Sequence, residues 1–470
     1  MILRQIFDPH LAQYAYLVGC PRSGEALLID PQRDIDRYLD EVARAGLRLT
    51  AVAETHIHAD FLTGTRELAM AGGVTAYLSA EGGDEWQYEW ARGGSVAVHL
   101  LHHGDRFRLG GVELQALHTP GHTPEHLSFA ITDRGAGATT PWGLLSGDFV
   151  FAGDLGRPDL LESAAGAAGA AQTSARQLYG SLDTLRELPE FLQVWPGHGA
   201  GSACGKALGA VPSSTIGYEL RCNPAIAAAG EGEEAFVRAM VDGHAAPPLY
   251  FGRMKRLNRL GPPALPELPR PIPLEASQVA AEGARGAAVL DTRRDRAAFM
   301  AGHLPNSLWT PWNNTFPTLA GCYVEPDQEI FLVIDEDHLD AAVRNLVRVG
   351  LDRVRGWCSP ASLPAEGARL EVIDFDQAVE RQARGSHLVV DVRRRDEYAA
   401  GHLAGALHIP HTRLAAELDR IPRQRPLMVH CASGIRAAAA CSLLARQGYR
   451  VAHVDDRFQR LPASAVEPIG

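Results

Sequence analysis

An internal repeat in the second half of the chain constrains the fold more than any other feature of the sequence. Residues 288–311, AVLDTRRDRAAFMAGHLPNSLWTP, match residues 388–410, LVVDVRRRDEYAAGHLAGALHIP, through an apolar strand that ends in Asp and a later Gly-His-Leu. In each copy a second apolar strand leads into a helix-like segment, as parallel βαβ units require. The repeat therefore predicts two α/β domains of about 100 residues each.

A proline-rich stretch separates the repeat from the first half of the chain. Residues 248–273 read PLYFGRMKRLNRLGPPALPELPRPIP, and we interpret them as an interdomain linker because proline ends helices and central strands. Upstream, strand-like runs such as ALLID alternate with amphipathic segments, which indicates sheets covered by helices. We therefore predict an α/β domain over 1–247 and two repeat domains over 274–360 and 372–466.

The composition limits the classes of function. Of 470 residues, 46% are hydrophobic and 21% charged, as in soluble globular proteins. The net charge of −11 disfavours nucleic acid as a partner, because phosphate binding needs clustered Lys and Arg. The sequence shows neither a secretion signal nor an apolar run long enough for a membrane span. The seven cysteines are scattered, which indicates reduced thiols. We expect a cytoplasmic protein without a membrane partner, and one that forms homo-oligomers.

Four clusters of polar residues follow one another in the first domain. Residues 55–61, THIHADF, come directly after a strand-like run, and strand ends are where α/β sheets present catalytic groups. The others are 119–123 (TPGHT), 146–148 (SGD) and 196–199 (PGHG). A lone His is usually structural, but four ordered clusters with Gly or Pro beside the polar residue predict a metal site. We regard four further histidines as structural: His99, His102, His103 and His126.

These clusters resemble the metallo-β-lactamase superfamily over residues 1–245, whose fold is an αββα sandwich. Dinuclear members carry HxHxDH, but Phe61 stands here in place of the last His. This difference, and the Gly-Arg-Pro-Asp segment at 156–159, resemble the persulfide dioxygenase branch. The resemblance implies one Fe(II) per chain, held by His56, His122 and Asp148.

The chemistry of this ligand set agrees with the resemblance. Two imidazoles and one carboxylate leave three open positions on an octahedral ion, as in non-haem Fe(II) enzymes that activate oxygen. A persulfide can bind such an ion as its anion, beside O2. The resemblance implies oxidation of the persulfide to a sulfinate-type product that hydrolyses to sulfite.

Three polar residues of the dinuclear pattern remain, namely His58, Asp60 and His198. They either hold a second metal, which Phe61 disfavours, or orient a ligand or substrate by hydrogen bonds. Arg157 and Asp159 either brace their loop or contact a substrate carboxylate, and we favour bracing.

Cys204 lies in a Gly-Ser-Ala-Cys-Gly-Lys segment directly after the last His cluster. It is either a thiol whose pKa is lowered by Lys206 near the metal or part of a tight turn.

A second chemical motif, CASGIRA at 431–437, follows an apolar strand and precedes a helix-like stretch. Small residues at a helix N-terminus form an anion cradle, which with Arg436 would stabilise a Cys431 thiolate and allow it to carry a sulfane sulfur. This loop resembles the rhodanese family over residues 372–465. The cradle residues are Ala432, Ser433, Gly434, Ile435 and Ala437.

The first repeat lacks this thiol. Its counterpart of the loop reads DEDHLD at 335–340, so we predict a non-catalytic rhodanese-like domain in which Cys322 and Cys358 are structural. In the second repeat we expect Arg393 and Asp396 to stabilise the domain.

The order of the three domains resembles bacterial persulfide dioxygenase–sulfurtransferase fusions, which implies a role in sulfide detoxification. The implied partners are O2, sulfite, thiosulfate and a small-molecule persulfide of glutathione, coenzyme A, cysteine or bacillithiol. Two alternatives remain: a glyoxalase-II-like thioester hydrolase that uses a metal-bound hydroxide, and a persulfide-binding relay without turnover.

Overall fold

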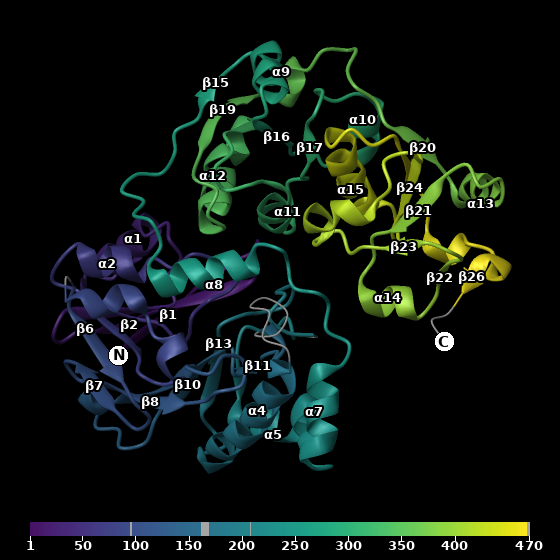
Figure 1. Ribbon diagram of the computed structural model, residues 1–470. Helices are drawn as coiled ribbons and strands as arrows, with labels where there is room; N and C mark the ends of the chain where they lie inside the picture. Colours follow the sequence, from purple (N-terminus) through teal and green to yellow (C-terminus); the bar gives the residue numbers. More distant parts are fainter. Residues whose placement is uncertain (95, 161–168, 207, 468–470) are drawn as a thin grey trace. The chain divides into compact units, whose positions relative to one another are not determined.

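The structure is a computed structural model that describes residues 1–94, 96–160, 169–206 and 208–467. The chain divides into two compact units, and Figure 1 labels their helices and strands. The first comprises Met1–His244 and Phe251–Pro266, and the second comprises Ala245–Tyr250 and Glu267–Gly470.

Two six-stranded sheets form the centre of the first unit. The first sheet has the order β1 (Ile2–Asp8), β2 (Gln13–Cys20), β3 (Glu25–Ile29), β4 (Arg48–Ala53), β5 (Thr75–Ser79) and β6 (Val98–Leu101). The second has the order β14 (Ser214–Thr215), β13 (Gln193–Pro196), β10 (Gly143–Gly147), β9 (Leu127–Asp133), β8 (Val112–His118) and β7 (Arg106–Leu109). A small ribbon, β11 (Val150–Phe151) and β12 (Asp154–Leu155), follows β10.

Helices cover the outer faces of both sheets. The helices among the described residues of this unit are α1 (Asp36–Arg44), α2 (Thr65–Met70), α4 (Ala170–Glu187), α5 (Ile216–Cys222), α6 (Pro224–Ala229), α7 (Glu233–Val241) and α8 (Phe251–Leu260).

Strand β2 shows how the sequence produces these layers, because its side chains alternate between the two faces. Tyr16 and Val18 pack into the core between the sheets, where they meet residues of the second sheet such as Phe129. Ala15 and Leu17 face the opposite way and pack in the core that includes the helical residues of α1 and α2. A third core joins the second sheet to α4 and α7. The four layers confirm the predicted αββα sandwich.

Helix α8 corrects the interpretation of residues 248–273 as a linker. The prolines lie at 248 and from 262 onward, and the ten residues between Phe251 and Leu260 contain none, so a helix forms there. Its apolar face is buried in the first unit through Phe251 and Met254.

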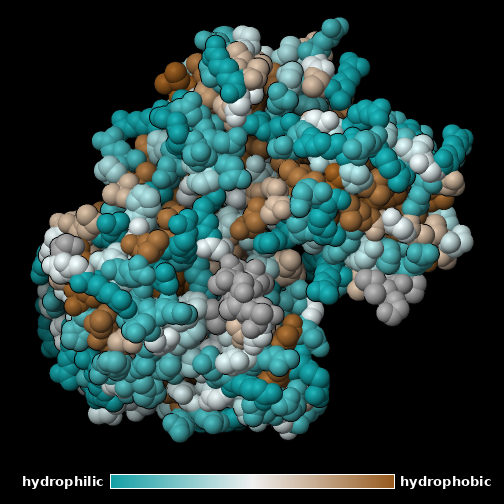
Figure 2. Space-filling view, in the orientation of Figure 1, coloured by the Kyte–Doolittle hydropathy of each residue, from teal (hydrophilic) through white to brown (hydrophobic). Residues whose placement is uncertain are grey.

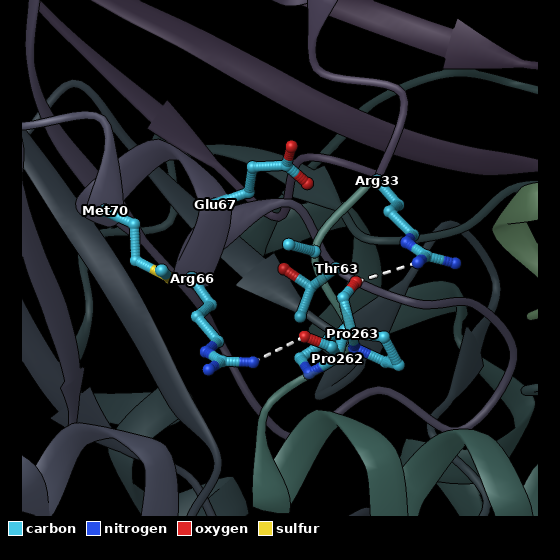
Figure 3. A pocket seen from close by; sticks show the side chains of 8 residues that line it. Arg33, Thr63, Arg66, Glu67, Met70, Pro262 and Pro263 are labelled. Carbon is cyan, nitrogen blue, oxygen red and sulfur yellow. Dashed lines mark hydrogen bonds between the residues drawn. The ribbon is translucent and has the colours of Figure 1, made fainter. Parts of the chain in front are cut away.

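The proline segment after α8 is also attached to the first unit. Figure 3 shows a small cavity in which Arg66 donates a hydrogen bond to the carbonyl of Pro262, at 2.7 Å, and Arg33 donates to that of Pro263, at 2.8 Å. Because proline has no N–H, these carbonyls are the polar groups by which such a segment is held.

The second unit contains two five-stranded sheets with the same strand order, as the repeat predicts. The first is β15 (Ile272–Pro273), β19 (Val354–Cys358), β18 (Ile330–Val333), β16 (Ala288–Asp291) and β17 (Leu308–Trp309). The second is β20 (Glu371–Ile373), β25 (Val451–Val454), β24 (Leu427–His430), β21 (Leu388–Asp391) and β23 (Leu407–His408). The strand pairs within both sheets are parallel. A separate antiparallel pair joins β22 (His402–Leu403) to β26 (Val466–Glu467).

The helices of the second unit alternate with these strands along the chain, as parallel βαβ units require. They are α9 (Ala276–Ala284), α10 (Arg296–Ala301), α11 (Phe316–Tyr323), α12 (Leu339–Arg348), α13 (Phe375–Ala383), α14 (Arg395–Ala399) and α15 (Ile435–Arg446).

Among the described residues, no helix is both long and apolar enough to span a bilayer. Hydrophilic residues dominate the face of the molecule seen in Figure 2.

Candidate functional site

The four polar clusters of the first unit lie at the carboxyl ends of strands. His56 and His58 follow β4, His122 follows β8, Asp148 follows β10, and His198 follows β13. The structure brings His56, His122 and Asp148 together, with one ligand atom of each within 4.8 Å of the others and all three side chains buried.

Hydrogen bonds fix the orientation of the His56 ring. Asp30, at the end of β3, accepts hydrogen bonds from the backbone N–H of Thr55, at 2.7 Å, and from its hydroxyl, at 2.8 Å. Because that hydroxyl proton is used, Thr55 Oγ1 accepts from Nδ1 of His56, at 2.9 Å. The Nε2 lone pair therefore remains free for a metal. Burial and the neighbouring histidines lower the pKa of His56 well below its usual range, which keeps the ring neutral.

His122 is held in the same way. Its Nδ1 donates to the carbonyl of Arg157, at 3.1 Å, and burial lowers its pKa to about 4. Its Nε2 lies 3.4 Å from Oδ2 of Asp148. That oxygen is buried without a hydrogen-bond partner among the described residues, although burying an unpaired carboxylate oxygen is costly. Two neutral imidazoles around an unpaired carboxylate oxygen fit a divalent cation.

His198 bridges two carboxylates behind this set. Its Nδ1 donates to Oδ1 of Asp148, at 2.8 Å, and its Nε2 donates to Oδ2 of Asp60, at 2.9 Å. Burial opposes the charged ring, but the two carboxylates raise the pKa of His198 well above its usual range. The charge of His198 in turn lowers the pKa of Asp148 against the effect of burial. Both ring nitrogens are thus engaged by carboxylates.

His58 and Phe61 lie in the motif that holds a second metal in dinuclear members of the superfamily. His58 Nε2 lies 3.1 Å from Oδ1 of Asp30, and the buried Phe61 ring packs on the His58 ring with centroids 4.4 Å apart. A second group of possible ligand atoms consists of Asp60, His198 and Cys204, within 4.8 Å of one another.

Cys204 is buried, and its surroundings disfavour the thiolate form. Burial, followed by the charges of Asp60 and Asp148, raises its pKa well above the usual value. Lys206, which would lower this pKa in one of the two alternatives, donates instead to the carbonyl of Ala239, at 3.0 Å. The alternative in which the Cys204 pKa is lowered is therefore wrong, because burial and the charges of Asp60 and Asp148 raise it.

Arg157 and Asp159 form a bidentate ion pair, in which Nε donates to Oδ1 at 2.7 Å and Nη2 donates to Oδ2 at 2.6 Å. Arg157 also donates to the carbonyl of Ala203, at 3.1 Å, and its backbone N–H donates to the carbonyl of Cys204, at 3.2 Å. Since its own carbonyl holds His122, Arg157 connects a candidate ligand to the Cys204 loop.

Helix α8 contributes a residue that sequence reasoning did not identify. Buried Asn258 donates to the carbonyls of His58, at 2.8 Å, and Phe61, at 2.7 Å, and accepts from the N–H of Thr63, at 3.1 Å. It therefore holds the loop that carries the first motif. The only available signal was a polar residue in the apolar phase of a helix, inside a stretch interpreted as a linker.

Lys255, one turn earlier, places a positive charge beside the site. Its Nζ lies 4.1 Å above the Trp86 ring, and burial lowers its pKa to about 8. Its charge contributes to the lowered pKa of His122. The adjoining cavity of about 310 Å³ is lined by Ile57, Glu85, Trp86, Gly252, Lys255, Arg256 and Arg259.

In the second unit, Cys431 directly follows β24, and α15 begins four residues later. Gly434 has a φ of 85°, which favours glycine and allows the chain to turn into the helix. Arg436 forms a two-pronged ion pair with Glu397 of α14, at 2.5 and 2.8 Å, and lies close enough to the Cys431 thiol to interact with it. Sequence reasoning missed Glu397, the neighbour of Asp396.

The remaining residues of the loop differ in burial. Ala437 is buried, whereas Ile435 is 51% exposed. Arg393 is buried in a two-pronged ion pair with Asp391, whereas Asp396 pairs with the exposed Arg394.

The strand register identifies the counterpart of Cys431 in the first repeat. Asp291 pairs with Val333, as Asp391 pairs with His430, so Ile334 occupies the place of Cys431. The sequence assigned this place to residues 335–340, one residue too late. Ile334 is fully buried and offers no nucleophile.

Comparisons with known proteins agree with this architecture. The family model described as metallo-beta-lactamase superfamily matches residues 9–198, and that described as rhodanese-like domain matches residues 374–460. A crystal structure of a metallo-beta-lactamase from Staphylococcus aureus is 37% identical, with a TM-score of 0.68, over 77% of this chain and 99% of that chain.

Two curated relatives match up to half of the chain. Mouse persulfide dioxygenase ETHE1 (Mus musculus) is 30% identical over 42% of this chain and 68% of its own length. The beta-lactamase hydrolase-like protein of Agrobacterium fabrum is 30% identical over 50% of this chain, and the chain spans 54% of that relative. Proteins named hydroxyacylglutathione hydrolase also match, at 31% and 35% identity. The chain belongs to the metallo-beta-lactamase superfamily and carries a rhodanese-like domain in the same polypeptide.

Proposed function

We propose that the first unit is an Fe(II)-dependent persulfide dioxygenase and that the second unit transfers sulfane sulfur through Cys431. The observation that carries the proposal is the three-residue ligand set, in which Asp148 Oδ2 has no partner among the described residues while Phe61 replaces a ligand of the dinuclear pattern. The persulfide dioxygenases among the relatives support the same reading.

His56, His122 and Asp148 would hold the ion, one per chain. Bound Fe(II) would supply Lewis acidity and open positions for O2 and the persulfide sulfur. The residues of the chain keep this set in the required protonation states: Thr55 and the Arg157 carbonyl hold both imidazoles neutral with Nε2 free, and His198 holds Asp148 ionised. The overall reaction is RSSH + O2 + H2O giving RSH, sulfite and two protons.

In the second unit, the Cys431 thiolate attacks the outer sulfur of thiosulfate. The S–S bond of thiosulfate breaks, sulfite leaves with its electron pair, and Cys431 becomes a persulfide. A second thiolate or sulfite then takes the outer sulfur and regenerates Cys431. Arg436, whose charge is oriented by Glu397, stabilises the anionic sulfur beside the helix N-terminus.

The experiment measures O2 uptake by the Fe(II)-loaded full chain with glutathione persulfide, beside hydrolysis of a glutathione thioester. We expect O2 uptake and sulfite formation without thioester cleavage. Cys431→Ser should abolish transfer from thiosulfate and leave O2 uptake unchanged, and Cys441→Ser, a buried cysteine of α15, is the matched control. Thioester cleavage without O2 uptake would establish a hydrolase, the activity named among several relatives. Persulfide binding without either activity would establish a relay.

A further inference from the structure

We propose that Arg296, in the repeat whose corresponding loop has no cysteine, is a positioning residue for the sulfur-carrying loop of the other repeat. The inference rests on the proposed sulfur transfer through Cys431. It assigns a role to the first repeat, which has Ile334 in place of a nucleophile.

Arg296 reaches the loop from the start of α10. Its Nη1 donates to the carbonyl of Ser433, at 3.2 Å, and its Nη2 donates to Oδ1 of Asp455, at 2.5 Å. The guanidinium is 25% exposed and the Asp455 carboxylate 27%, so the pair is partly shielded from water. A planar guanidinium can hold both acceptors at once, which fixes the carbonyl relative to Asp455.

This contact completes a row of three restrained carbonyls. The N–H of Phe458 donates to the carbonyl of Ala432, at 2.9 Å, and His453 Nε2 lies 2.9 Å from the carbonyl of Gly434. Arg296 holds the carbonyl between them, that of Ser433. The first and third restraints come from the second repeat itself, and only the middle one comes from the first repeat.

Because the peptide bond is planar, restraining each carbonyl also fixes the direction of the N–H group that follows it. In a trans peptide the C=O and the following N–H point in opposite directions. Because the carbonyls of residues 432–434 are held from outside the turn, the N–H groups of residues 433–435 are directed to its other side. Converging N–H groups at a helix start bind anions, as a Cys431 persulfide or a bound thiosulfate requires.

Gly434 shows how closely the turn packs on this ion pair. A Cβ atom at Gly434 would lie 2.5 Å from Oδ1 of Asp455 and 3.2 Å from the guanidinium carbon of Arg296. No side chain fits between the turn and the Arg296–Asp455 ion pair. If Arg296 moved, the Ser433 carbonyl would lose the hydrogen bond that holds it.

The first repeat also holds the helix that follows the loop. The N–H of Trp309 donates to the hydroxyl of buried Ser442, at 2.9 Å, and Arg446 donates to the carbonyl of Asn306, at 2.8 Å. Helix α15 is therefore restrained by the first repeat near its start, in its middle and at its end, and the peptides at its start have a fixed orientation.

The test compares Arg296→Ala, Arg296→Lys and a control in the full chain. Arg285→Ala is the control, because it removes the same charge from an exposed ion pair with Glu282 in the same repeat. We expect Arg296→Ala to raise KM for thiosulfate and lower kcat/KM about tenfold, which corresponds to ~1.4 kcal/mol. Arg296→Lys, which keeps the charge but lacks the planar guanidinium that holds two acceptors, should show a smaller loss of kcat/KM. O2 uptake should not change.

A second measurement does not depend on turnover. Cys431 is alkylated with iodoacetate, an anion, and with iodoacetamide, which is neutral, and the two rates at Cys431 are compared by mass spectrometry. We expect the iodoacetate-to-iodoacetamide rate ratio to fall in Arg296→Ala and to stay at the wild-type value in Arg285→Ala.

Three outcomes would overturn the inference: an unchanged KM and rate ratio in Arg296→Ala, an equal loss in Arg285→Ala, or a loss of kcat that matches a smaller folded fraction. Failure of the proposed function is different, because the wild-type chain would then transfer no sulfur from thiosulfate.

Discussion

His198 donates a hydrogen bond to Oδ1 of Asp148 across 2.8 Å, and the other oxygen of that carboxylate has no hydrogen-bond partner among the described residues. The same ring donates to Asp60, so one buried cation favours the ionised form of the candidate ligand Asp148 and fixes the orientation of its carboxylate.

The first prediction concerns this ring. His198→Asn removes the charge and one of the two hydrogen bonds, and we expect iron affinity to fall 10- to 100-fold, the usual effect of losing a group that orients a metal ligand. Titration of the apo-protein with Fe(II) under anaerobic conditions measures it. His99→Asn, on β6, is the control. Unchanged affinity would show that His198 does not support the ligand set.

The second prediction concerns metal stoichiometry. Phe61→His restores the imidazole of the dinuclear pattern next to Asp60 in the chain and against the His58 ring, so we expect the metal content after zinc loading to rise from about one toward two per chain. Phe61→Leu, which supplies no ligand, should remain at one. Elemental analysis after dialysis distinguishes these results, and two zinc ions in the wild type would contradict a mononuclear centre.

The third prediction concerns α8. Asn258→Ala leaves the carbonyls of His58 and Phe61 and the N–H of Thr63 without their partner, and we expect a loss of about 3 kcal/mol in the free energy of unfolding of the first unit. Leu260→Ala, at the exposed end of the same helix, should cost less than about 0.5 kcal/mol. Urea unfolding monitored by circular dichroism gives both values, and equal costs would mean that the Asn258 contacts contribute nothing.

The fourth prediction concerns pH. Burial would raise the pKa of Glu397, but the ion pair with Arg436 lowers it to about 2. The folded value lies below the unfolded one, so the pair contributes its full stabilisation above about pH 4.5 and loses it as the pH falls toward 2. Glu397→Gln should therefore lower the urea midpoint of the second unit at pH 7, with a smaller difference at pH 3. A difference independent of pH would exclude this ion pair as its source.

Sequence reasoning located the candidate ligands because they lie at strand ends beside glycine or proline, where local signals are strong. It also gave the two repeats, since both copies retain an apolar strand, Asp and Gly-His-Leu. It missed what depends on distant contacts. Asn258 contacts residues about 200 positions away, and Arg296 reaches a loop 137 positions away. A periodic pattern in the sequence carries no information on contacts between such distant residues.

The sequence could not decide between the two alternatives for Cys204, for a related reason. The sequence shows Lys206 two residues away, whereas folding places Asp60 and Asp148 against the thiol. The counterpart of Cys431 was off by one residue because only strand pairing fixes the register.

The course of the chain through α8 affects how the protein can be divided. Residues 245–250 belong to the second unit, but residues 251–266 return to the first. A fragment that ends at residue 247 would therefore keep all the candidate ligands and lose Asn258. A fragment that ends at residue 266 contains the whole first unit, including Asn258. Fragments that end at residues 247 and 266 should therefore differ in metal retention, although their candidate ligands are identical. A chimaeric protein that receives this domain must accordingly include helix α8, which lies beyond the apparent end of the domain.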